Sequence, residues 1–418
     1  MHSAELNSRI TVLACMARIT VLGGCGAVGS IAVQTLRNMP DFDQIVIADI
    51  NTEKAEVLAS EPGKACKPLE VDVLNTKALQ NAIQGSEVVL NCVGPFYRYG
   101  PLILQAAIKT GVNYVDICDD VEPTRTLLDM DAAAKKVNVS ACIGMGSSPG
   151  VTNLLVRFAA DQLLDSINAI DIYHAHGGEP TEGAAVIAHR IHAMTSDIPL
   201  FLDGKLQTVQ FLNQRGIDLR EEIDFHQIGT HQVFPYPHPE TITLPKYIKC
   251  QRVTNKGTVL PGEYFQFIIN LVKLGIISEE PINVKGQLVV PLDFIIAYII
   301  NERERILKET NFGKQRGCVK IVVTGTRKDK SHQYVFSMSS IGQAMGEGTG
   351  IPAALGAILM HRRKIPAKGV NPPEACIKPM DFLAIMQESL QLEQITGKSS
   401  PLLIESIDYK GDVKQLSL

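Results

Sequence analysis

The chain has 418 residues, and on a guide of roughly 150 residues per domain this length predicts two domains with a sizeable core. Its formal net charge of −4 at pH 7 gives no overall positive field, which excludes a general affinity for nucleic acid or for an anionic membrane surface. The nine cysteines are scattered without a Cys-x-x-Cys pair, so neither a disulfide framework nor a zinc cluster is expected. No apolar run is long enough to cross a bilayer, so no membrane segment is predicted.

Residues 1–15 are expected to form an N-terminal extension ahead of the first domain. Arg9 precedes an apolar stretch, as in a signal peptide, but that stretch runs directly into the strand predicted from Arg18. Cleavage there would damage the domain, so a cytoplasmic protein is predicted. One five-residue sequence begins at Arg9 and again at Arg18, which leaves Met1 and Met16 as alternative translation starts.

A glycine-rich turn follows the first predicted strand. Gly24, Gly26 and Gly29 have the Gly-x-Gly-x-x-Gly spacing of dinucleotide-binding folds, and Asp49 ends the next apolar run. In such folds the first glycine permits a tight turn, the second lets backbone N–H groups approach the pyrophosphate, and the third lets the helix pack on the strand. The alternative is a glycine-rich turn in another α/β fold. The flanking elements are predicted at Arg18–Leu22 (strand), Ala27–Asn38 (helix) and Gln44–Asp49 (strand).

Strands and helices continue to alternate to about residue 150. This alternation predicts an α/β domain over residues 16–150, a Rossmann-type doubly wound parallel sheet. The further strands are predicted to end at Glu70–Val73 and to span Glu87–Val93, Asn113–Asp116 and Val139–Ile143. The further helices are predicted from Thr52 and at Asn75–Ile83, Leu102–Thr110 and Pro123–Lys136.

Ligands of such sheets bind beyond the carboxyl ends of the strands. The glycine loop with its following residues Ala27 and Val28, then Asp49, then Asp72 and Val73, is expected to hold phosphate, ribose and adenine in that order. Later strand ends are expected around the nicotinamide and the substrate. They are Asn91, Val93, Gly94 and Pro95, then Asp116–Asp120, then Gly144–Gly150. Each set has a structural alternative, because Gly-Pro pairs also form ordinary turns and acids at strand ends also cap helices.

Several motifs together resemble the saccharopine dehydrogenase-like family of NAD(P)-dependent oxidoreductases. They are the glycine fingerprint, Asn91–Phe96, Gly100–Pro101, Gly111–Asp116, Gly146–Gly150, Thr349–Ala353 and Gly369–Glu374. The resemblance covers nearly all of the chain. The chain length and the segment Phe225–Thr241 look most like the lysine 6-dehydrogenase-like members.

The resemblance implies a second, α+β domain at 151–347, a C-terminal segment at 348–418 that returns to the nucleotide domain, and a homodimer formed through the second domain. The sequence pattern agrees, because the regular alternation is lost after residue 150. A helix is predicted near Thr349 with Pro352 in its first turn. Strands are predicted at Ala169–His174, Gly317–Thr326 and Gln333–Ser339, with a polar hairpin turn at Lys328–Ser331.

The resemblance also implies the chemistry, which makes or breaks a C–N bond of an amino acid by moving hydride to or from nicotinamide. No metal is required. The cofactor is NAD or NADP, with NAD slightly preferred, because the Asp49 carboxylate repels a 2′-phosphate and Ile50 replaces an arginine of many relatives. The partner is a small amino-acid-like substrate. The alternatives are a carboxynorspermidine-type polyamine reductase and a non-catalytic dinucleotide-binding protein.

A general acid/base is needed near the substrate nitrogen. Asp120 is the candidate, since it lies in a cluster with Asp116 and Asp119 in which like charges raise a pKa. The alternative is that Asp119 or Asp120 caps the next helix. Tyr97 is a second candidate, although family members tend to carry Tyr directly after the Gly-Pro turn, where this chain has Phe96.

Two further segments carry candidate catalytic residues. Glu182–Ser196 is predicted as an amphipathic helix with His192 on its polar face, which faces the active site or merely solvent. Thr230–His238 is proline-rich and aromatic, which suits a substrate lid or a stiffened loop. His231 and Tyr236 are the candidates within it.

Overall fold

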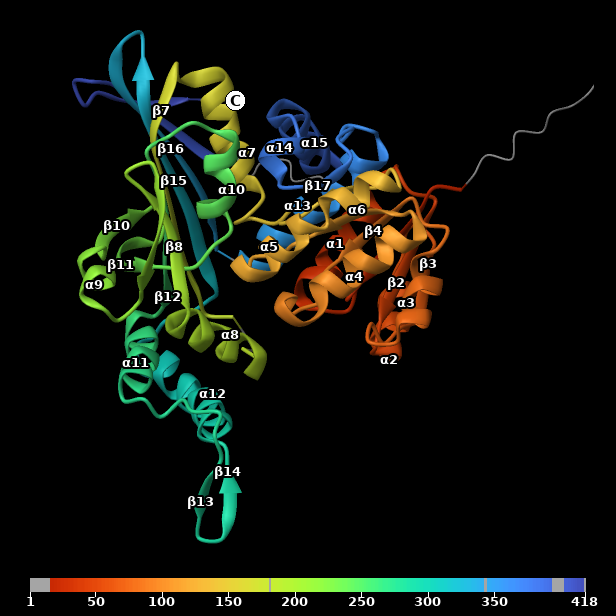
Figure 1. The fold of residues 1–418 in the computed structure, drawn as a ribbon, viewed down its shortest axis with the longest axis horizontal. Helices are drawn as coiled ribbons and strands as arrows, with labels where there is room; N and C mark the ends of the chain where they lie inside the picture. Colours follow the sequence, from red (N-terminus) through yellow and green to blue (C-terminus); the bar gives the residue numbers. More distant parts are fainter. Residues whose placement is uncertain (1–15, 180–181, 342–343, 393–401, 417–418) are drawn as a thin grey trace, which may run out of the picture.

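The structure is a computed structural model that describes residues 16–179, 182–341, 344–392 and 402–416. It contains two large sheets, one in a nucleotide-type domain and one in a second domain (Figure 1), and a separate two-stranded sheet of β13 (Ile282–Val284) and β14 (Gln287–Val289). A cleft lies between the two large sheets. The predicted extension 1–15 lies outside the described residues. No helix of the described residues is long and apolar enough to span a membrane.

The first sheet has seven parallel strands in the order β17-β6-β5-β4-β1-β2-β3. Its first six strands by sequence therefore have the 3-2-1-4-5-6 order of the dinucleotide-binding fold, which confirms the predicted doubly wound sheet. The order reverses between β1 and β4, where such folds bind their ligand. The strands are β1 (Arg18–Leu22), β2 (Gln44–Asp49), β3 (Cys66–Glu70), β4 (Val88–Asn91), β5 (Asn113–Asp116), β6 (Ser140–Cys142) and β17 (Gly369–Asn371).

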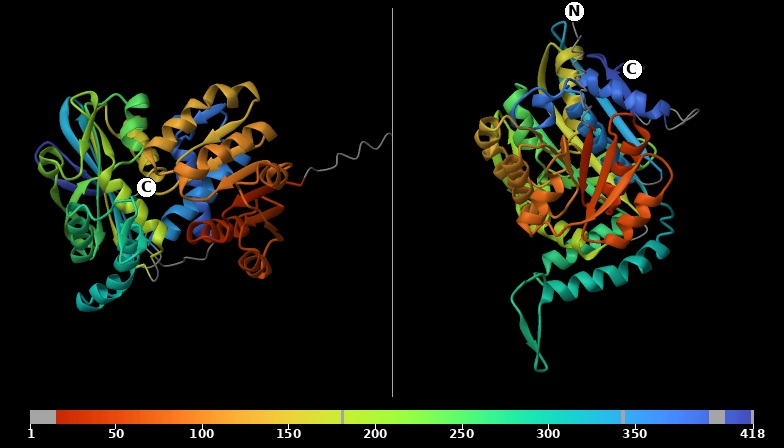
Figure 2. Two further views of the ribbon diagram at one scale, coloured as in Figure 1. Left: turned by 60° about the horizontal axis from the view of Figure 1, so that its bottom comes forward. Right: turned by 90° about the vertical axis from the view of Figure 1, so that its right-hand side faces the viewer.

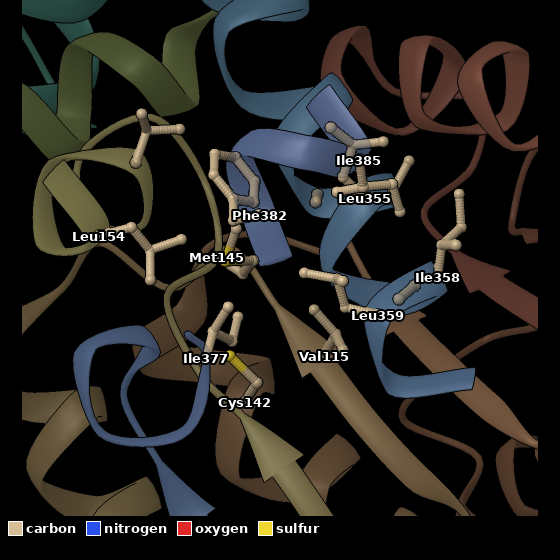
Figure 3. Close-up of a cluster of buried hydrophobic side chains, with 14 of the residues drawn as sticks. Val115, Cys142, Met145, Leu154, Leu355, Ile358, Leu359, Ile377, Phe382 and Ile385 are labelled. Atoms are coloured by element: carbon tan, nitrogen blue, oxygen red, sulfur yellow. The ribbon is translucent and has the colours of Figure 1, made fainter. Parts of the chain in front are cut away.

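Helices cover both faces of this sheet because its strand side chains alternate between two apolar clusters. Ile47 and Val115 pack on one face with α1 and α13, whereas Val89 and Tyr114 pack on the other with α3 and α4. Figure 3 shows the first of these clusters, in which Leu355 and Phe382 from the C-terminal segment lie over Val115. The helices are α1 (Ala27–Asn38), α2 (Thr52–Ser60), α3 (Thr76–Ile83), α4 (Phe96–Thr110), α5 (Val121–Asp129), α6 (Asp131–Lys136), α13 (Ala344–His361) and α15 (Pro379–Leu392).

Three predicted helix boundaries are wrong. Helix α4 begins at Phe96 rather than Leu102, because buried Phe96 packs its first turn into the core. The helix predicted over Pro123–Lys136 is divided into α5 and α6 at Met130. Helix α13 begins at Ala344 rather than near Thr349, so Pro352 lies in its interior and not in its first turn.

The second sheet has ten strands. Its central path is β10-β11-β12-β7-β15-β16-β18-β19; off this path β8 pairs with β12, and β9 pairs with β8. The strands are β7 (Ser166–Gly177), β8 (Asp197–Leu202), β9 (Lys205–Gln210), β10 (Glu221–Phe225), β11 (Gly229–Pro235), β12 (Arg252–Leu260), β15 (Arg316–Arg327), β16 (Lys330–Ser340), β18 (Leu402–Ile407) and β19 (Val413–Leu416). The helices of this domain are α7 (Val151–Phe158), which leads into a π-helical turn at Ala159–Leu163, α8 (Ala184–Thr195), α9 (Gln214–Asp218), α10 (Glu240–Tyr247), α11 (Gly262–Lys273) and α12 (Pro291–Glu309).

The predicted hairpin is confirmed. Strands β15 and β16 pair antiparallel, and Lys328 and Asp329 turn between them with φ of +52° and +61°. Two consecutive left-handed residues are the signature of the tight turn that matches strand twist.

Two other expectations for this half of the chain change. The segment from Thr230 to Pro235 is not a lid, because it forms most of strand β11 and pairs with β10 and β12. The C-terminal segment divides between the domains: α13, α15 and β17 pack with the nucleotide sheet, whereas β18 and β19 extend the second sheet.

Candidate active site

A cavity of about 2010 Å³ lies between the carboxyl ends of the first sheet and the inner face of the second. The nucleotide domain contributes Val28 of α1, Gly94 and Pro95 after β4, and the acids Asp119 and Asp120. The second domain contributes polar side chains that include five histidines, His174, His176, His189, His226 and His238. Arg190 and Tyr236 line the cavity with them.

The geometry of the glycine loop suits a bound pyrophosphate. A Cβ on Gly29 would lie 2.1 Å from the Gly23 carbonyl oxygen, so this glycine is required for helix α1 to pack against the loop. A Cβ on Gly26 would meet only that same oxygen, at 3.4 Å, so the space in front of Gly26 is open. Helix α1 begins at the next residue and directs its N-terminus, which attracts anions, toward this space.

Asp49 lies at the end of β2 beside this loop. Its Oδ2 accepts a hydrogen bond from the Cys25 backbone N–H at 2.9 Å and its Oδ1 accepts one from the Asn51 N–H at 3.0 Å. The carboxylate is thus held at the edge of the glycine loop. Burial and the nearby Asp49 raise the pKa of the Cys25 thiol to about 11, which keeps this thiol neutral.

The other predicted cofactor residues divide into two groups. Val28, Gly94 and Pro95 line the cavity. Asn91 is buried instead, and it holds the turn after β4 by accepting a hydrogen bond from Val93 N–H at 2.9 Å. Asp72 and Val73 follow the end of β3, where the exposed Asp72 side chain accepts a hydrogen bond from Leu74 N–H.

The predicted acid cluster separates into two roles. Asp116 is fully buried, and its Oδ1 accepts hydrogen bonds from Cys118 N–H at 3.0 Å and from Gly144 N–H at 2.7 Å. It therefore joins the ends of β5 and β6, and burial raises its pKa to about 6. Asp120 faces the cavity instead, and its Oδ1 lies 3.4 Å from Nδ1 of His189.

Asp120 is the N-cap residue of α5, yet among the described residues no N–H of that helix donates to its carboxylate. The capping alternative therefore does not account for this side chain. Burial and the neighbouring Asp119 raise the pKa of Asp120, while His189, His192 and His238 oppose the rise. Raising the pKa of a carboxyl group makes its carboxylate a better proton acceptor, as a general base requires.

Helix α8 is amphipathic as predicted, with Ile187, Ile191 and Met194 buried. His192 lies on its outer side, where its Nε2 is 3.2 Å from the Ser196 hydroxyl. Its ring is 6.0 Å from that of Tyr97, which is 58% exposed. These two predicted candidates lie together, but it is His189, one turn earlier on α8, that meets Asp120.

The Thr230–His238 segment contains a catalytic candidate that sequence reasoning did not select. His238 is buried against the cavity, and its Nδ1 lies 2.9 Å from Oε2 of Glu240. Burial alone would lower the pKa of His238, but Glu240, Asp119 and Asp120 raise it. The pattern His-Pro-Glu, which places a carboxylate two residues from an imidazole, was the available signal.

Of the two residues predicted in that segment, Tyr236 reaches the cavity and His231 does not. Tyr236 is in the cavity lining, with its ring 5.9 Å from that of His238 and 5.3 Å from that of His174. His231 lies on β11, where its Nε2 is 3.3 Å from the Ile228 carbonyl oxygen. Its contact therefore belongs to the β10–β11 hairpin.

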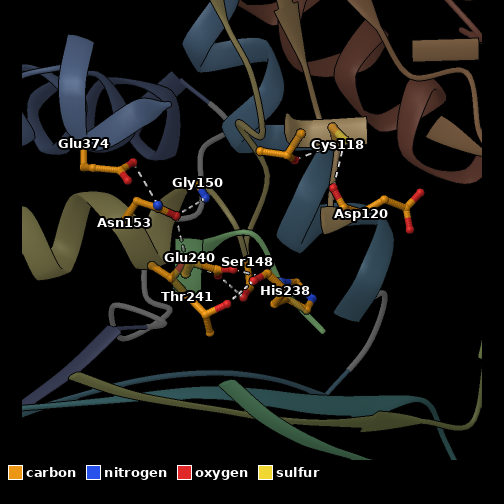
Figure 4. A network of polar contacts seen from close by, with 11 residues as sticks. Cys118, Asp120, Ser148, Gly150, Asn153, His238, Glu240, Thr241 and Glu374 are labelled. Carbon is orange, nitrogen blue, oxygen red and sulfur yellow. Dashed lines mark hydrogen bonds and ion pairs between the residues drawn. The ribbon is translucent and has the colours of Figure 1, made fainter. Parts of the chain in front are cut away.

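A buried polar network connects the His238–Glu240 pair to the nucleotide domain (Figure 4). Oε1 of Glu240 accepts hydrogen bonds from the hydroxyl groups of Ser148 and Thr152. Asn153 accepts one from Gly150 N–H at 2.9 Å and donates one to Glu374 at 2.8 Å. Two of the motifs that carried the family resemblance, Gly146–Gly150 and Gly369–Glu374, thus meet behind the catalytic candidate.

The stability of this network is expected to depend on pH through Glu374. Burial raises the pKa of this carboxyl from 4.5 to about 7, so its contribution to stability is fully present below the unfolded value and is lost as the pH rises through about 7. We expect Glu374→Gln, which keeps an oxygen for Asn153 but does not titrate, to reduce the fall in melting temperature over that range. Equal falls in both proteins, measured by differential scanning calorimetry, would show that Glu374 is not the group responsible.

Both halves of the chain match models of one protein family. Residues 19–142 match the saccharopine dehydrogenase NADP binding domain, and residues 146–392 match the saccharopine dehydrogenase C-terminal domain. The chain belongs to the saccharopine dehydrogenase family. It is therefore an NAD(P)-dependent oxidoreductase, as predicted, and it uses a nicotinamide dinucleotide.

Relatives of this saccharopine dehydrogenase family member match over nearly their full length. The chain is 24% identical to carboxyaminopropylagmatine dehydrogenase of Synechocystis sp., over 89% of this chain and 96% of the relative. It is 22% identical to carboxynorspermidine synthase of Vibrio alginolyticus, over 87% and 93% respectively. Saccharopine dehydrogenase (L-Glu forming) of Saccharomyces cerevisiae has the same fold, with a TM-score of 0.65, 16% identity, and coverage of 96% of this chain and 100% of that chain.

Gly257 makes room for one of the histidine rings on the second-domain side of the cleft. A Cβ on Gly257 of β12 would lie 1.9 Å from the His174 ring, so only glycine leaves room for the ring beside Tyr236 and His238. Arg190 also lines the cleft, but its guanidinium is already paired with buried Glu182. The cleft therefore presents imidazole groups opposite carboxylates, an arrangement that can hold and exchange protons on a polar substrate.

Proposed function

We propose that this family member transfers hydride between nicotinamide and the carbon of a C–N bond in an amino-acid-like substrate. The observation that carries the proposal is the meeting of two acid/base pairs in one cleft: Asp120 lies 3.4 Å from His189, and His238 is hydrogen-bonded to Glu240. Gly94 and Pro95, expected beside the nicotinamide, line the same cleft. When bound, the nicotinamide accepts or supplies the hydride.

The two pairs have different roles in this proposal. In the oxidative direction Asp120 removes a proton from the substrate nitrogen, which leaves its electron pair to form the imine as hydride departs from the carbon. His238, held at Nδ1 by Glu240, turns its other nitrogen to the cleft and donates a hydrogen bond to a substrate carboxylate. The rings of Tyr236 and His174 pack against the His238 ring in tilted contacts and help to fix its position.

An absorbance assay for reduced nicotinamide tests the proposal. Purified protein with NAD or NADP is supplied in turn with lysine, saccharopine, other basic amino acids and diamines. Substrate-dependent reduction of the cofactor with one of these supports a C–N oxidoreductase. Tight cofactor binding with no reaction in either direction would favour the non-catalytic dinucleotide-binding protein instead.

A second candidate substrate class is the carboxylated polyamine. Two relatives that match over nearly their full length are named carboxyaminopropylagmatine dehydrogenase and carboxynorspermidine synthase. Asp119 and Asp120 offer carboxylates to a cationic amine within the cleft. Supplying an aldehyde that bears a carboxylate, a diamine and the reduced cofactor distinguishes this class, because only a polyamine-forming reductase oxidises the cofactor with that pair.

We expect NAD to bind more tightly than NADP. The Asp49 carboxylate stands beside the glycine loop and would repel a 2′-phosphate, and Ile50, 71% exposed, supplies no cation to hold one. Fluorescence titration with both cofactors measures the preference. Ile50→Arg should reduce the preference for NAD by strengthening NADP binding. Tighter binding of NADP than of NAD to the native protein would contradict the predicted preference.

We also propose that the protein works in the cytoplasm as a homodimer. The eight cysteines that the structure describes are free thiols, which is typical of a reducing compartment. Fractionation of cells that express the full chain tests the location. Light scattering on the same protein tests the dimer, for which the expected mass is twice the chain mass of 45.6 kDa.

A further inference from the structure

Glu374 is a buried acid that takes no part in the proposed chemistry. It lies on α14 (Pro373–Cys376), in the C-terminal segment that packs on the nucleotide domain (Figure 1, Figure 2). Only 3% of its surface is exposed, and burying a carboxyl group is costly unless it is hydrogen-bonded. Its Oε2 accepts a hydrogen bond from Nδ2 of Asn153 at 2.8 Å, across 221 positions of the sequence. Asn153 is therefore the route by which this acid can act on the cleft.

The side-chain amide of Asn153 satisfies its neighbours in only one orientation. Its Oδ1 accepts a hydrogen bond from the Gly150 N–H at 2.9 Å and lies 3.2 Å from the Thr152 hydroxyl. Its NH₂ group donates to Glu374 on the other side. A flipped amide would turn that NH₂ group toward the Gly150 N–H, and two donors would then face each other. Glu374, which accepts from the NH₂ group, thus fixes the orientation of the amide.

The turn that Asn153 holds contains a hydroxyl group that binds Glu240. Gly150 has φ of +122°, and a Cβ on it would lie 2.1 Å from the Gly146 carbonyl oxygen, so the chain is tightly folded between these two glycines. Ser148 lies inside this turn, and its hydroxyl donates to Oε1 of Glu240. A change in the Asn153 amide would leave the buried Gly150 N–H unpaired, which is unfavourable. The position of the Ser148 hydroxyl therefore depends on Asn153.

Glu240 connects these groups to His238. The carboxylate is fully buried, and its Oε1 accepts hydrogen bonds from the hydroxyl groups of Ser148 and Thr152. Thr152 directly precedes Asn153 in the first turn of α7. The other oxygen, Oε2, lies 2.9 Å from Nδ1 of His238. Because a buried carboxylate is destabilised when it loses a donor, Glu240 is expected to move with the two hydroxyl groups, and the imidazole is expected to move with Glu240.

We propose that Glu374 is a positioning residue that acts through Asn153 and holds the His238 ring in the cleft. The link runs from the Asn153 amide through the Gly146–Gly150 turn to Glu240 and ends at Nδ1 of the imidazole (Figure 4). The inference rests on the proposed function only for the task of His238, which is to bind a substrate carboxylate. Both protonation states of Glu374 keep an oxygen that accepts from Asn153, so the link does not require this carboxyl to titrate.

Four variants separate this link from general destabilisation. Glu374→Leu removes the acceptor of the Asn153 hydrogen bond, whereas Glu374→Gln keeps an oxygen and the size of the side chain. Asn153→Ala breaks the same contact from the other side and replaces Glu374→Leu if that protein does not fold. Cys376→Ala is the matched control, since it shortens a buried side chain of the same helix whose thiol donates to the Pro372 carbonyl oxygen. Circular dichroism identifies the variants that fold.

NMR of isotope-labelled histidines tests the link in the free protein, without turnover. The His238 signal is identified by its absence from His238→Gln. Burial lowers the pKa of His238, but the adjacent Glu240 raises it above its usual value. When Glu240 is displaced, this support is lost, so both contact-breaking variants should lower the proton affinity of His238 at least about tenfold. Glu374→Gln and Cys376→Ala should titrate like the native protein. The other titratable groups near the ring are His174, Asp119 and Asp120.

Kinetics with the substrate found in the absorbance assay give the second measurement. Glu374→Leu should raise KM at least about tenfold and change kcat little, because it weakens substrate binding and leaves the base in place. Glu374→Gln should restore the native KM. A folded Glu374→Leu protein with a native His238 titration overturns the inference, as does an equal change in Cys376→Ala. A displaced His238 with no change in KM, or with no substrate found, would leave the link standing and contradict the proposed function instead.

Discussion

Asp120→Asn is expected to lower turnover at least tenfold while cofactor affinity stays nearly unchanged. A positioned general base contributes roughly a hundredfold or more, and the amide cannot take a proton. Because the carboxylate caps no described N–H of α5, the substitution removes no helix bond, and Asn keeps the size of the side chain. Steady-state kinetics and a cofactor titration on the same protein measure both quantities.

The pH profile distinguishes proton transfer from a structural role for Asp120. A base works only when deprotonated, so kcat/KM of the native enzyme should fall as the pH drops through the raised pKa of Asp120. His189 opposes that rise, and His189→Gln should therefore move this acid limb to higher pH. Full activity of Asp120→Asn, with an unchanged acid limb, would transfer the role of base to another group, and His238, which also lines the cleft, is the next candidate.

The nucleotide half of this fold could be predicted because its signals are local. The glycine spacing and the alternation of apolar runs with helices lie within short windows, and strands β1, β2 and β5 have the predicted ends. The helix boundaries were harder to predict from the sequence. Pro101 suggests that a helix begins just after it, but α4 begins five residues earlier, at Phe96. Phe96 is buried, and burial depends on the tertiary structure, which no local pattern shows.

The second half could be predicted only in outline, because its strands pair across long separations. Strand β7 pairs with β12 and β15, which lie far away in the sequence, and no local pattern states that register. For the same reason, the sequence did not identify His238 as part of the site. In the sequence, His238 is only one histidine in a proline-rich segment. In the folded protein, Asp119 and Asp120 of the other domain lie close enough to raise its pKa.

Arg190 illustrates a further limit. It lies three residues after buried Ile187 on α8, so it falls on the apolar face where a helical pattern predicts no charge. The tertiary structure explains its position, because the guanidinium donates one hydrogen bond to Glu182 and another to the Tyr264 hydroxyl, and the Tyr264 ring lies beside it. Arg303 approaches the same carboxylate at 3.2 Å from a helix more than one hundred residues away.

Gly26→Val is expected to weaken cofactor binding at least about a hundredfold, which is about 2.8 kcal/mol at about 1.4 kcal/mol per tenfold. The branched side chain would fill the open space in front of α1 where the pyrophosphate is expected. The fold should survive, because Gly26 has φ of −71° and ψ of 168°, an extended conformation that valine readily adopts.

Two matched variants make the result interpretable. Gly183 caps α8 with φ of −79° and ψ of 160°, and a Cβ there meets nothing within 4 Å, so Gly183→Val should fold and bind cofactor normally. Gly29→Val should instead unfold the domain, since its Cβ would lie 2.1 Å from the Gly23 carbonyl oxygen. Cofactor titration and circular dichroism on all three proteins separate loss of the site from loss of the fold. Near-native affinity in a folded Gly26→Val protein would mean that the pyrophosphate does not lie over this glycine.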